Sequence, residues 1–245
     1  MSMRKIVKRI SINIKDRKRM AKYKKLKPAS TGEDMRMAAD MIKKLTTLRP
    51  QNVFEIGANL AQDAEVLMQE FAERGGVRPE SVYVFEAHPQ LFRYIKRLHR
   101  FNAYHCAVSN EDGNHMFHMP DALASNSGVS SLLENHEFNY TQKVKVKTIR
   151  MDTFMKDHSI TAADFVKIDV EGCTWEVLDG FGDRLRDVRA IQLEAEHTEA
   201  WKGEKLYYDI EKKMTESGFE LLWFERKFDQ SDSLWVKKEF VKIQP

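Results

Sequence analysis

The chain has only two cysteines among 245 residues, Cys106 and Cys173. So few cysteines give no disulfide framework, and their spacing is not that of metal ligands. No apolar stretch approaches the roughly 20 residues that cross a bilayer, and the N-terminus lacks the apolar core of a signal peptide. We therefore expect a cytoplasmic protein, at most peripheral to a membrane surface.

Glycine-rich phosphate-binding motifs are also missing. The pattern G-x-x-x-x-G-K-[ST] does not occur, so nothing in the sequence favours ATP-driven chemistry. Dinucleotide binding needs three glycines in the pattern G-x-G-x-x-G, so that a pyrophosphate can lie against a helix start, and the first predicted strand-to-helix turn has only Gly57. A ligand with a ribose but no phosphates fits this turn better, and S-adenosylmethionine (SAM) is such a ligand.

Charge is distributed unevenly along the chain. Residues 1–27 hold twelve Lys/Arg and one acid, whereas the whole chain has 40 Lys/Arg and 37 Asp/Glu. We expect a basic N-terminal arm over residues 1–29 and one domain over residues 30–245. Such an arm either docks on an anionic surface or polyanion, or is a solvated tail that keeps the protein soluble.

Apolar periodicity predicts strands that alternate with helices. The expected strands are 53–56, 82–85, 104–108, 144–149, 165–168, 191–193, 219–224 and 234–241, and the expected helices follow a capping box at 30–33 and lie at 60–72, 89–100, after 152, 174–181 and 204–217. Residues 109–148 break this rhythm and are expected to form a loop or insertion. The last two strands are too close for a helical crossover, so they must pair antiparallel. The predicted fold is α/β, with a doubly wound, mostly parallel seven-stranded sheet that ends in a C-terminal antiparallel hairpin.

Charged residues follow three of the predicted strands. Glu86 ends the second strand, the segment 167–171 ends the strand at 165–168, and Glu194 to His197 end the strand at 191–193. Doubly wound folds keep their active sites at the carboxyl ends of their strands. Gly57, at the first strand end, lets the chain turn sharply and lets a ligand approach the backbone, so a side chain there is expected to fill cofactor space.

Six segments together resemble the FkbM family of class I SAM-dependent methyltransferases. They are Phe54-Glu55-Ile56-Gly57-Ala58-Asn59, Val84-Phe85-Glu86-Ala87-His88-Pro89, Ala107-Val108-Ser109, Ser127-Gly128-Val129-Ser130-Ser131-Leu132, Met151-Asp152-Thr153-Phe154 and Lys167-Ile168-Asp169-Val170-Glu171-Gly172. The resemblance implies a Rossmann-like fold with SAM as cofactor, and methylation of a hydroxyl on a sugar, glycan or glycosylated metabolite. It also implies Glu55, Gly57 and Asn59 near the methionine end of SAM, Glu86 on the ribose, and Ala107, Val108 and Ser109 beside the adenine. The sequence departs from the family at Ala61, where a glycine is usual, and at Ala87-His88, where a proline commonly follows the glutamate directly.

The expected catalytic residues are Asp169, Glu171 and His197. Asp169 is the first choice to position the acceptor or take its proton, and His197 is the second because its usual pKa lies near neutrality. Glu171 is expected to orient the site or cap the next helix. No metal ligand is assigned, but a metal-assisted variant stays open, because these three residues, Glu194 and Glu196 could supply oxygen and imidazole ligands.

Two other functions stay open at this point. A nucleic-acid methyltransferase is supported only by the basic arm, which lacks the interleaved aromatics of single-strand binders. A non-catalytic SAM-binding module is the second alternative, although the charged strand ends argue against it. The identity of the acceptor and the oligomeric state are not encoded in any readable motif.

Because the arm precedes the first predicted helix, deletion of residues 1–27 is expected to leave the thermal midpoint and the SAM affinity nearly unchanged. Thermal melts and calorimetric titration of the full and shortened chains check this. A shortened chain that does not fold would make the arm part of the domain.

Overall fold

The computed structural model describes residues 32–72, 76–98, 100–120, 127–137, 140 and 142–243. The predicted basic arm and Ser30 of the predicted capping box lie outside these residues. Within the described ranges, no helix combines the length and the apolar character that a membrane span requires.

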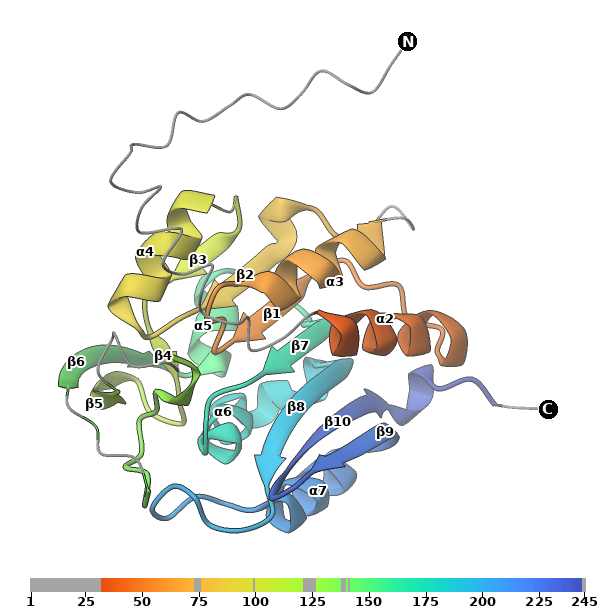
Figure 1. Ribbon diagram of the computed structural model, residues 1–245. Coiled ribbons are helices and arrows are strands. Elements are labelled where there is room, and N and C mark those ends of the chain that lie inside the picture. Colours follow the sequence, from red (N-terminus) through yellow and green to blue (C-terminus); the bar gives the residue numbers. More distant parts are fainter. Residues whose placement is uncertain are drawn as a thin grey trace.

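A seven-stranded sheet forms the centre of the fold, in the order β3-β2-β1-β7-β8-β10-β9 (Figure 1). Its strands are β1 (Val53–Ile56), β2 (Val82–Phe85), β3 (Asn102–Tyr104), β7 (Phe165–Ile168), β8 (Ala190–Glu196), β9 (Phe219–Lys227) and β10 (Gln230–Lys237). The first five pair in parallel, whereas β10 runs antiparallel to both β8 and β9. The predicted mostly parallel sheet with a C-terminal antiparallel hairpin is confirmed.

Helices cover both faces of this sheet. One face packs against α2 (Glu33–Leu45), α3 (Gln62–Ala72) and α4 (Pro89–Leu98), and the other against α5 (Met151–Asp157), α6 (Thr174–Gly180) and α7 (Tyr207–Glu216). Successive strand residues point to opposite faces, so Val53 belongs to the first core and Phe54 to the second. Short 3₁₀ helices lie at Pro79–Ser81, Ser127–Val129, Gly182–Asp187 and Lys238–Phe240.

A second, three-stranded sheet has the order β4-β6-β5 and consists of β4 (Ala107–Val108), β5 (Gly113–Met119) and β6 (Gln142–Ile149). The prediction of one strand over 104–108 was wrong. The chain instead leaves the main sheet after Tyr104, which pairs with β2, and joins the small sheet at Ala107, which pairs with Thr148. The expected loop at 109–148 likewise contains β5. An apolar run does not reveal its pairing partner, which is why the sequence missed both features.

The start of α2 differs from the predicted capping box. The helix begins at Glu33, and its N-cap is Gly32, which has a φ of 72° and makes no side-chain capping bond. A Cβ at Gly32 would lie 2.7 Å from the Cγ2 of Val66 on α3, so the two helices meet closely here. The left-handed backbone at this N-cap favours glycine there.

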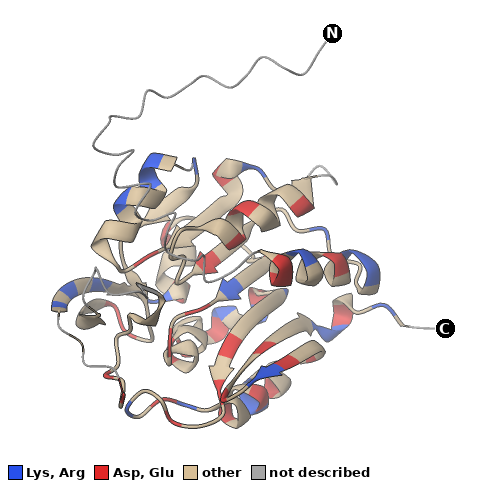
Figure 2. Ribbon diagram, in the orientation of Figure 1, with Lys and Arg blue, Asp and Glu red and all other residues tan. Residues whose placement is uncertain are grey.

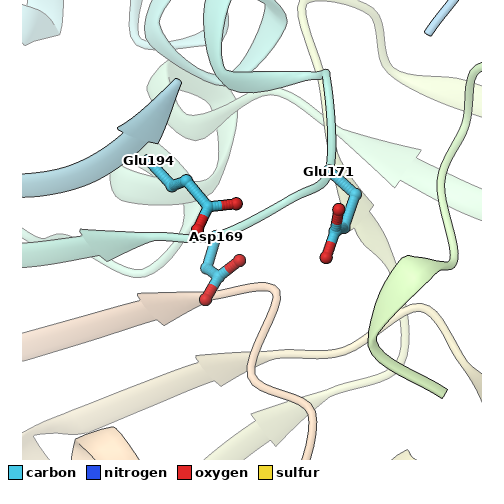
Figure 3. A group of neighbouring side chains, drawn as sticks. All are labelled: Asp169, Glu171 and Glu194. Atoms are coloured by element: carbon cyan, nitrogen blue, oxygen red, sulfur yellow. The ribbon is translucent and has the colours of Figure 1, made fainter. Parts of the chain in front are cut away.

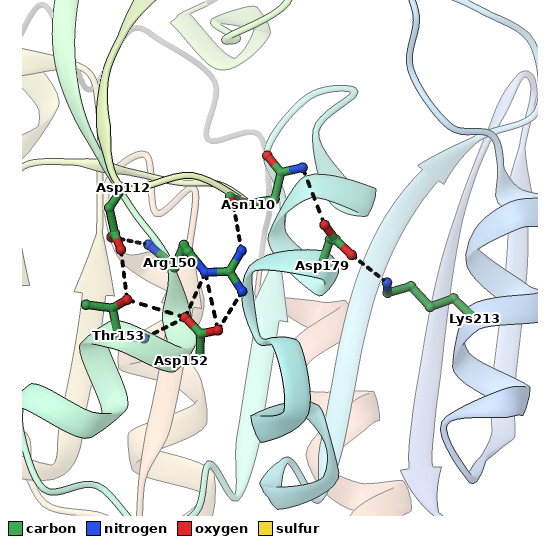
Figure 4. A network of polar contacts seen from close by, with 7 residues as sticks. All are labelled: Asn110, Asp112, Arg150, Asp152, Thr153, Asp179 and Lys213. Carbon is green, nitrogen blue, oxygen red and sulfur yellow. Dashed lines mark hydrogen bonds and ion pairs between the residues drawn. The ribbon is translucent and has the colours of Figure 1, made fainter.

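A polar network ties the small sheet to helices α5, α6 and α7 (Figure 4). The guanidinium of Arg150 donates from Nη1 to the carbonyl of Asn110 at 2.6 Å and from Nε to Asp152 at 2.9 Å. Asn110 donates to Asp179 on α6, which also accepts from Lys213 on α7 at 3.1 Å. These contacts fix the chain after β4, and with it one end of the site described next.

Candidate functional site

One cavity of about 680 Å³ lies at the carboxyl edge of the parallel strands. Its described lining includes twelve Asp or Glu residues but only two lysines, Lys167 and Lys227. Figure 2 shows acidic residues at the ends of β7 and β8, while lysines and arginines gather on α4 and β6. The cavity is therefore suited to a ligand that carries positive charge, and it disfavours a pyrophosphate.

The loop after β1 is held in a left-handed conformation. Gly57, Asn59 and Ala61 have φ values of 81°, 48° and 56°. At Gly57 an added Cβ would lie 1.7 Å from the backbone oxygen of Asp169. The glycine is thus required first by the contact between β1 and the end of β7, which differs from the expectation that a side chain would fill cofactor space.

Glu86 clamps this loop to the end of β2. Its Oε2 accepts the Asn59 N–H and its Oε1 accepts the His88 N–H, both at 2.6 Å. Glu86 is 6% exposed, and burial raises its pKa to about 7 despite these two hydrogen bonds. Each carboxylate oxygen keeps a further lone pair, so the side chain can still accept two hydroxyl donors from the cavity.

Glu55 and the chain after β3 border the same cavity. Glu55 is buried, accepts the N–H of Ala64 in the first turn of α3 at 3.0 Å, and has its pKa raised well above the usual value, chiefly by burial. Ala107 and Val108 line the cavity. Ser109 does not: its N–H donates to the carbonyl of Ile149, and its own carbonyl packs against Gly180 of α6.

The ends of β7 and β8 bring carboxylates together. Asp169, Glu171 and Glu194 each place an oxygen within 4.8 Å of the others (Figure 3). Burial and, next, the charge of Asp169 raise the pKa of Glu194 to about 8. Burial and, next, Glu204 raise the pKa of Glu196 to about 9. The carboxyl groups at the ends of β7 and β8 thus lie close together, as the sequence predicted. Repulsion between their negative charges helps to raise the pKa values of these groups.

Lys167 lies beneath this cluster. Its Nζ is 3.3 Å from Oδ2 of Asp169, and the residue is 4% exposed. Burial alone would lower the pKa of Lys167, but the surrounding carboxylates, Asp169 foremost, raise it above its usual value. Lys167 is therefore a fixed cation that compensates part of the negative charge.

His197 does not line the cavity, which contradicts its expected catalytic position. It follows Glu196 directly, so strand alternation turns its ring to the opposite face of the sheet. There the imidazole stacks on Tyr207, with ring centroids 5.0 Å apart, and lies edge-on to Phe224. Burial, with a smaller effect of Arg226, lowers the pKa of His197.

Two chain segments pair across the mouth of the cavity. The His136 N–H donates to the carbonyl of Ala200 at 2.9 Å, and the Lys202 N–H donates to the carbonyl of Glu134 at 2.8 Å. Trp201 packs over Gly172, where a Cβ would lie 2.8 Å from the tryptophan side chain.

Three further side chains of this region were missed as site residues. Ser131 donates from Oγ to the carbonyl of Glu171 at 2.6 Å, and the Nε1 of Trp201 donates to the hydroxyl of Tyr140 at 3.2 Å. Ser131 lies within a segment that carries the family resemblance, whereas no local pattern marks Tyr140 or Trp201.

Comparisons with known proteins agree with this fold. The family model described as the methyltransferase FkbM domain matches residues 55–221. A crystal structure of a methyltransferase FkbM from Methylobacillus flagellatus KT is similar, with a TM-score of 0.51 and 11% identity, and the match covers 77% of this chain and 44% of that chain. This chain therefore spans less than half the length of that protein.

Two other solved structures have lower TM-scores. Magnesium protoporphyrin IX methyltransferase from Synechocystis PCC 6803, with bound SAM, has a TM-score of 0.45 and 10% identity over 93% of this chain and 85% of that one. A SAM-dependent methyltransferase from Aquifex aeolicus has a TM-score of 0.46 and 10% identity over 89% of this chain and 97% of that one. No curated protein matches the chain.

Substitution of Gly57 by alanine is expected to lower the free energy of unfolding by about 3 kcal/mol or more, because the methyl group collides with the Asp169 backbone in addition to the left-handed strain. Gly218→Ala is the matched control, since Gly218 has the same φ of 81° and nothing within 4 Å of a built Cβ. The control is expected to lose only about 1–2 kcal/mol. Urea denaturation measures both, and equal losses would contradict the collision.

The raised pKa of Glu86 predicts a pH-dependent stability of the cofactor-free protein. The folded state binds this proton more tightly than the unfolded chain, whose pKa is near 4.5, so stability is expected to fall as pH rises from about 4.5 to about 7. The contribution is about 3 kcal/mol.

Urea denaturation across this pH range measures the effect. Glu86→Gln should remove the part of the pH dependence of the unfolding free energy that comes from Glu86. The amide nitrogen of the glutamine would face a backbone N–H donor, so this variant is expected to be less stable at every pH. Exposed Glu80→Gln is the control. Parallel profiles for the native protein and Glu86→Gln would exclude Glu86 as the titrating group.

Proposed function

Because the chain belongs to the FkbM methyltransferase domain family, we propose that it transfers a methyl group from SAM to a hydroxyl oxygen of a sugar, a glycan or a glycosylated metabolite. What carries the proposal is one cavity whose lining includes both Glu86, after β2, and the carboxylates of β7 and β8. We assign Glu86 to the ribose of the cofactor and the β7 and β8 carboxylates to the acceptor, since doubly wound folds bind their ligands at the carboxyl ends of the strands.

The cofactor end fits SAM in two respects. Glu86 is a buried carboxylate with acceptor capacity left for two ribose hydroxyls. The acidic lining favours a sulfonium cation and opposes a phosphate-bearing dinucleotide. SAM supplies an electrophilic methyl group when bound. We assign Glu55, Gly57 and Asn59 to its methionine side, Glu86 to its ribose, and Ala107 and Val108 to its adenine. Ser109 does not contact the cavity, and its role is to hold the segment of Ala107 and Val108 in place.

The acceptor end supports a hydroxyl nucleophile. A neutral alcohol that keeps its hydroxyl proton is a poor nucleophile. A carboxylate within hydrogen-bond reach takes this proton as the oxygen–methyl bond forms and the carbon–sulfur bond breaks. Asp169 follows the strand that neighbours β1, so it lies beside the cofactor loop and is the residue we assign to this proton. The Nζ of Lys167, 3.3 Å from Oδ2 of Asp169, orients this carboxylate. Exclusion of water and alignment of the reactants supply the rest of the acceleration.

The walls of the acceptor end support a sugar-like substrate. Asn135, His136 and Glu199 offer polar groups to hydroxyls, and Trp201 adds an aromatic surface. Such a mixture of polar and aromatic side chains suits a ligand that has both hydroxyls and apolar ring faces.

Transfer of a labelled methyl group from SAM to a panel of mono- and oligosaccharides tests the proposal. The label is expected in a product that resists mild alkali, because methyl ethers resist it and methyl esters do not. Label recovered only in alkali-labile esters or in amines would overturn hydroxyl methylation.

Asp169→Asn is expected to lower the transfer rate by at least about 10²-fold while the SAM dissociation constant changes little, because the substitution keeps the shape and removes the base. His197→Ala is the control, since the ring lies on the opposite face, and it should keep the turnover of the native protein. Single-turnover transfer and calorimetric SAM titration measure both. Normal turnover by Asp169→Asn would move the base elsewhere.

A further inference from the structure

The carboxylates of Asp169, Glu171 and Glu194 form a compact group at the acceptor end. One oxygen from each lies within 4.8 Å of the other two, and all three residues are half-buried (Figure 3). The three come from two adjacent strand ends, so the backbone fixes their spacing. When all three are ionised, carboxylates held this closely repel one another, and either a bound proton or a cation between them relieves that repulsion.

The protein itself supplies little compensation to this group. Lys167 reaches Asp169, on the side that faces the sheet. Among the described residues, the carboxylate of Glu171 has neither a hydrogen-bond donor nor a cation at ion-pair distance. The left-handed φ of 53° at Glu171 sets the chain direction at this point. Apart from the Lys167–Asp169 pair, the group therefore has no fixed cation of the described chain at ion-pair distance on its cavity side.

Gln192 provides an independent indication of a missing partner. It is fully buried, lines the same cavity and lies two residues before Glu194 on the same face of β8. Its Nε2 donates to Asp232 at 2.9 Å, but its Oε1 has no partner among the described residues. A buried amide oxygen without a donor or cation costs free energy, and this one belongs to a residue of the same cavity lining as the three carboxylates.

We propose that Asp169, Glu171 and Glu194 bind one divalent cation of the hard, oxygen-preferring kind, Mg²⁺ or Mn²⁺. Carboxylate oxygens are the ligands these ions prefer, and such ions keep open positions for water or substrate oxygens. The role of the ion rests on the proposed function: Asp169, Glu171 and Glu194 would hold it, and it would supply a positive charge that binds acceptor oxygens. His197, on the opposite face of the sheet, takes no part.

Binding of Mn²⁺ to the full chain, without SAM or acceptor, tests the site by calorimetry and by the loss of the free-ion electron paramagnetic resonance signal. One ion per chain is expected. Asp169→Asn and Glu194→Gln should each weaken binding by at least about tenfold. Asp229→Asn is the matched control, because Asp229 lines the same cavity outside the group, and it should bind as the native protein does.

Thermal melts give a second measurement that does not depend on activity. Mn²⁺ is expected to raise the midpoint of the native protein and of Asp229→Asn, and not that of the two ligand variants. If either ligand variant fails to fold, Glu171→Gln replaces it, since Glu171 follows the end of β7. Absence of stoichiometric binding at millimolar Mn²⁺, or undiminished binding in the ligand variants, would overturn the proposal.

One further arm separates a metal ion from a cationic substrate. If glucosamine raises the thermal midpoint and Mn²⁺ does not, the group recognises an ammonium ion and the metal proposal is wrong. Because these measurements need no methyl transfer, failure of hydroxyl methylation leaves the metal result standing, and a negative metal result leaves the methyl-transfer assay interpretable.

Discussion

The approach of the β1 loop to the end of β7 is the constraint on which the site depends. Asp169 donates its N–H to the carbonyl of Ile56 at 2.9 Å, and Gly57 leaves no room for a side chain against the Asp169 carbonyl. This contact joins the loop assigned to the cofactor to the carboxylates assigned to the acceptor. Any shift there would change the alignment on which an in-line displacement depends.

Charge inside the sheet is the second organising feature. Glu55, Lys167 and Gln192 pair in register across β1, β7 and β8, and Gln192 bonds to Asp232 on β10. All four are buried. Apolar residues would stabilise these positions at lower cost, because buried charges lose several kcal/mol of hydration even when they are paired. We interpret this polar row as a stability cost retained for the chemistry at the strand ends.

The mouth of the cavity owes its shape to distant segments. The pairing of residues 134–136 with 200–202 and the packing of Trp201 on Gly172 hold both segments over the ends of β7 and β8. Trp201, which lines the cavity, is held from behind by its hydrogen bond to the hydroxyl of Tyr140. Substrate selectivity should therefore depend on residues far apart in the sequence, as is usual for loops carried by a rigid sheet.

The sequence by itself predicted most elements of the main sheet, its mostly parallel character and its C-terminal antiparallel hairpin, but it missed β5 and the break between β3 and β4. Apolar runs of strand length alternate with amphipathic helices, and charged residues follow the strands at Glu86, Asp169 and Glu194. These signals are local, and the geometry of a doubly wound sheet then gathers the strand ends at one edge. The FkbM resemblance added the cofactor and the reaction class.

Only the tertiary structure decided which side chains share the cavity. Strand alternation turned His197 away and left Glu196 in the lining, and it is the pairing of β4 with β6 that moved Ser109 behind the site. The requirement for Gly57 comes from a backbone 112 positions further along the chain, at Asp169. Such outcomes depend on contacts between distant segments, which no local pattern of residue types encodes.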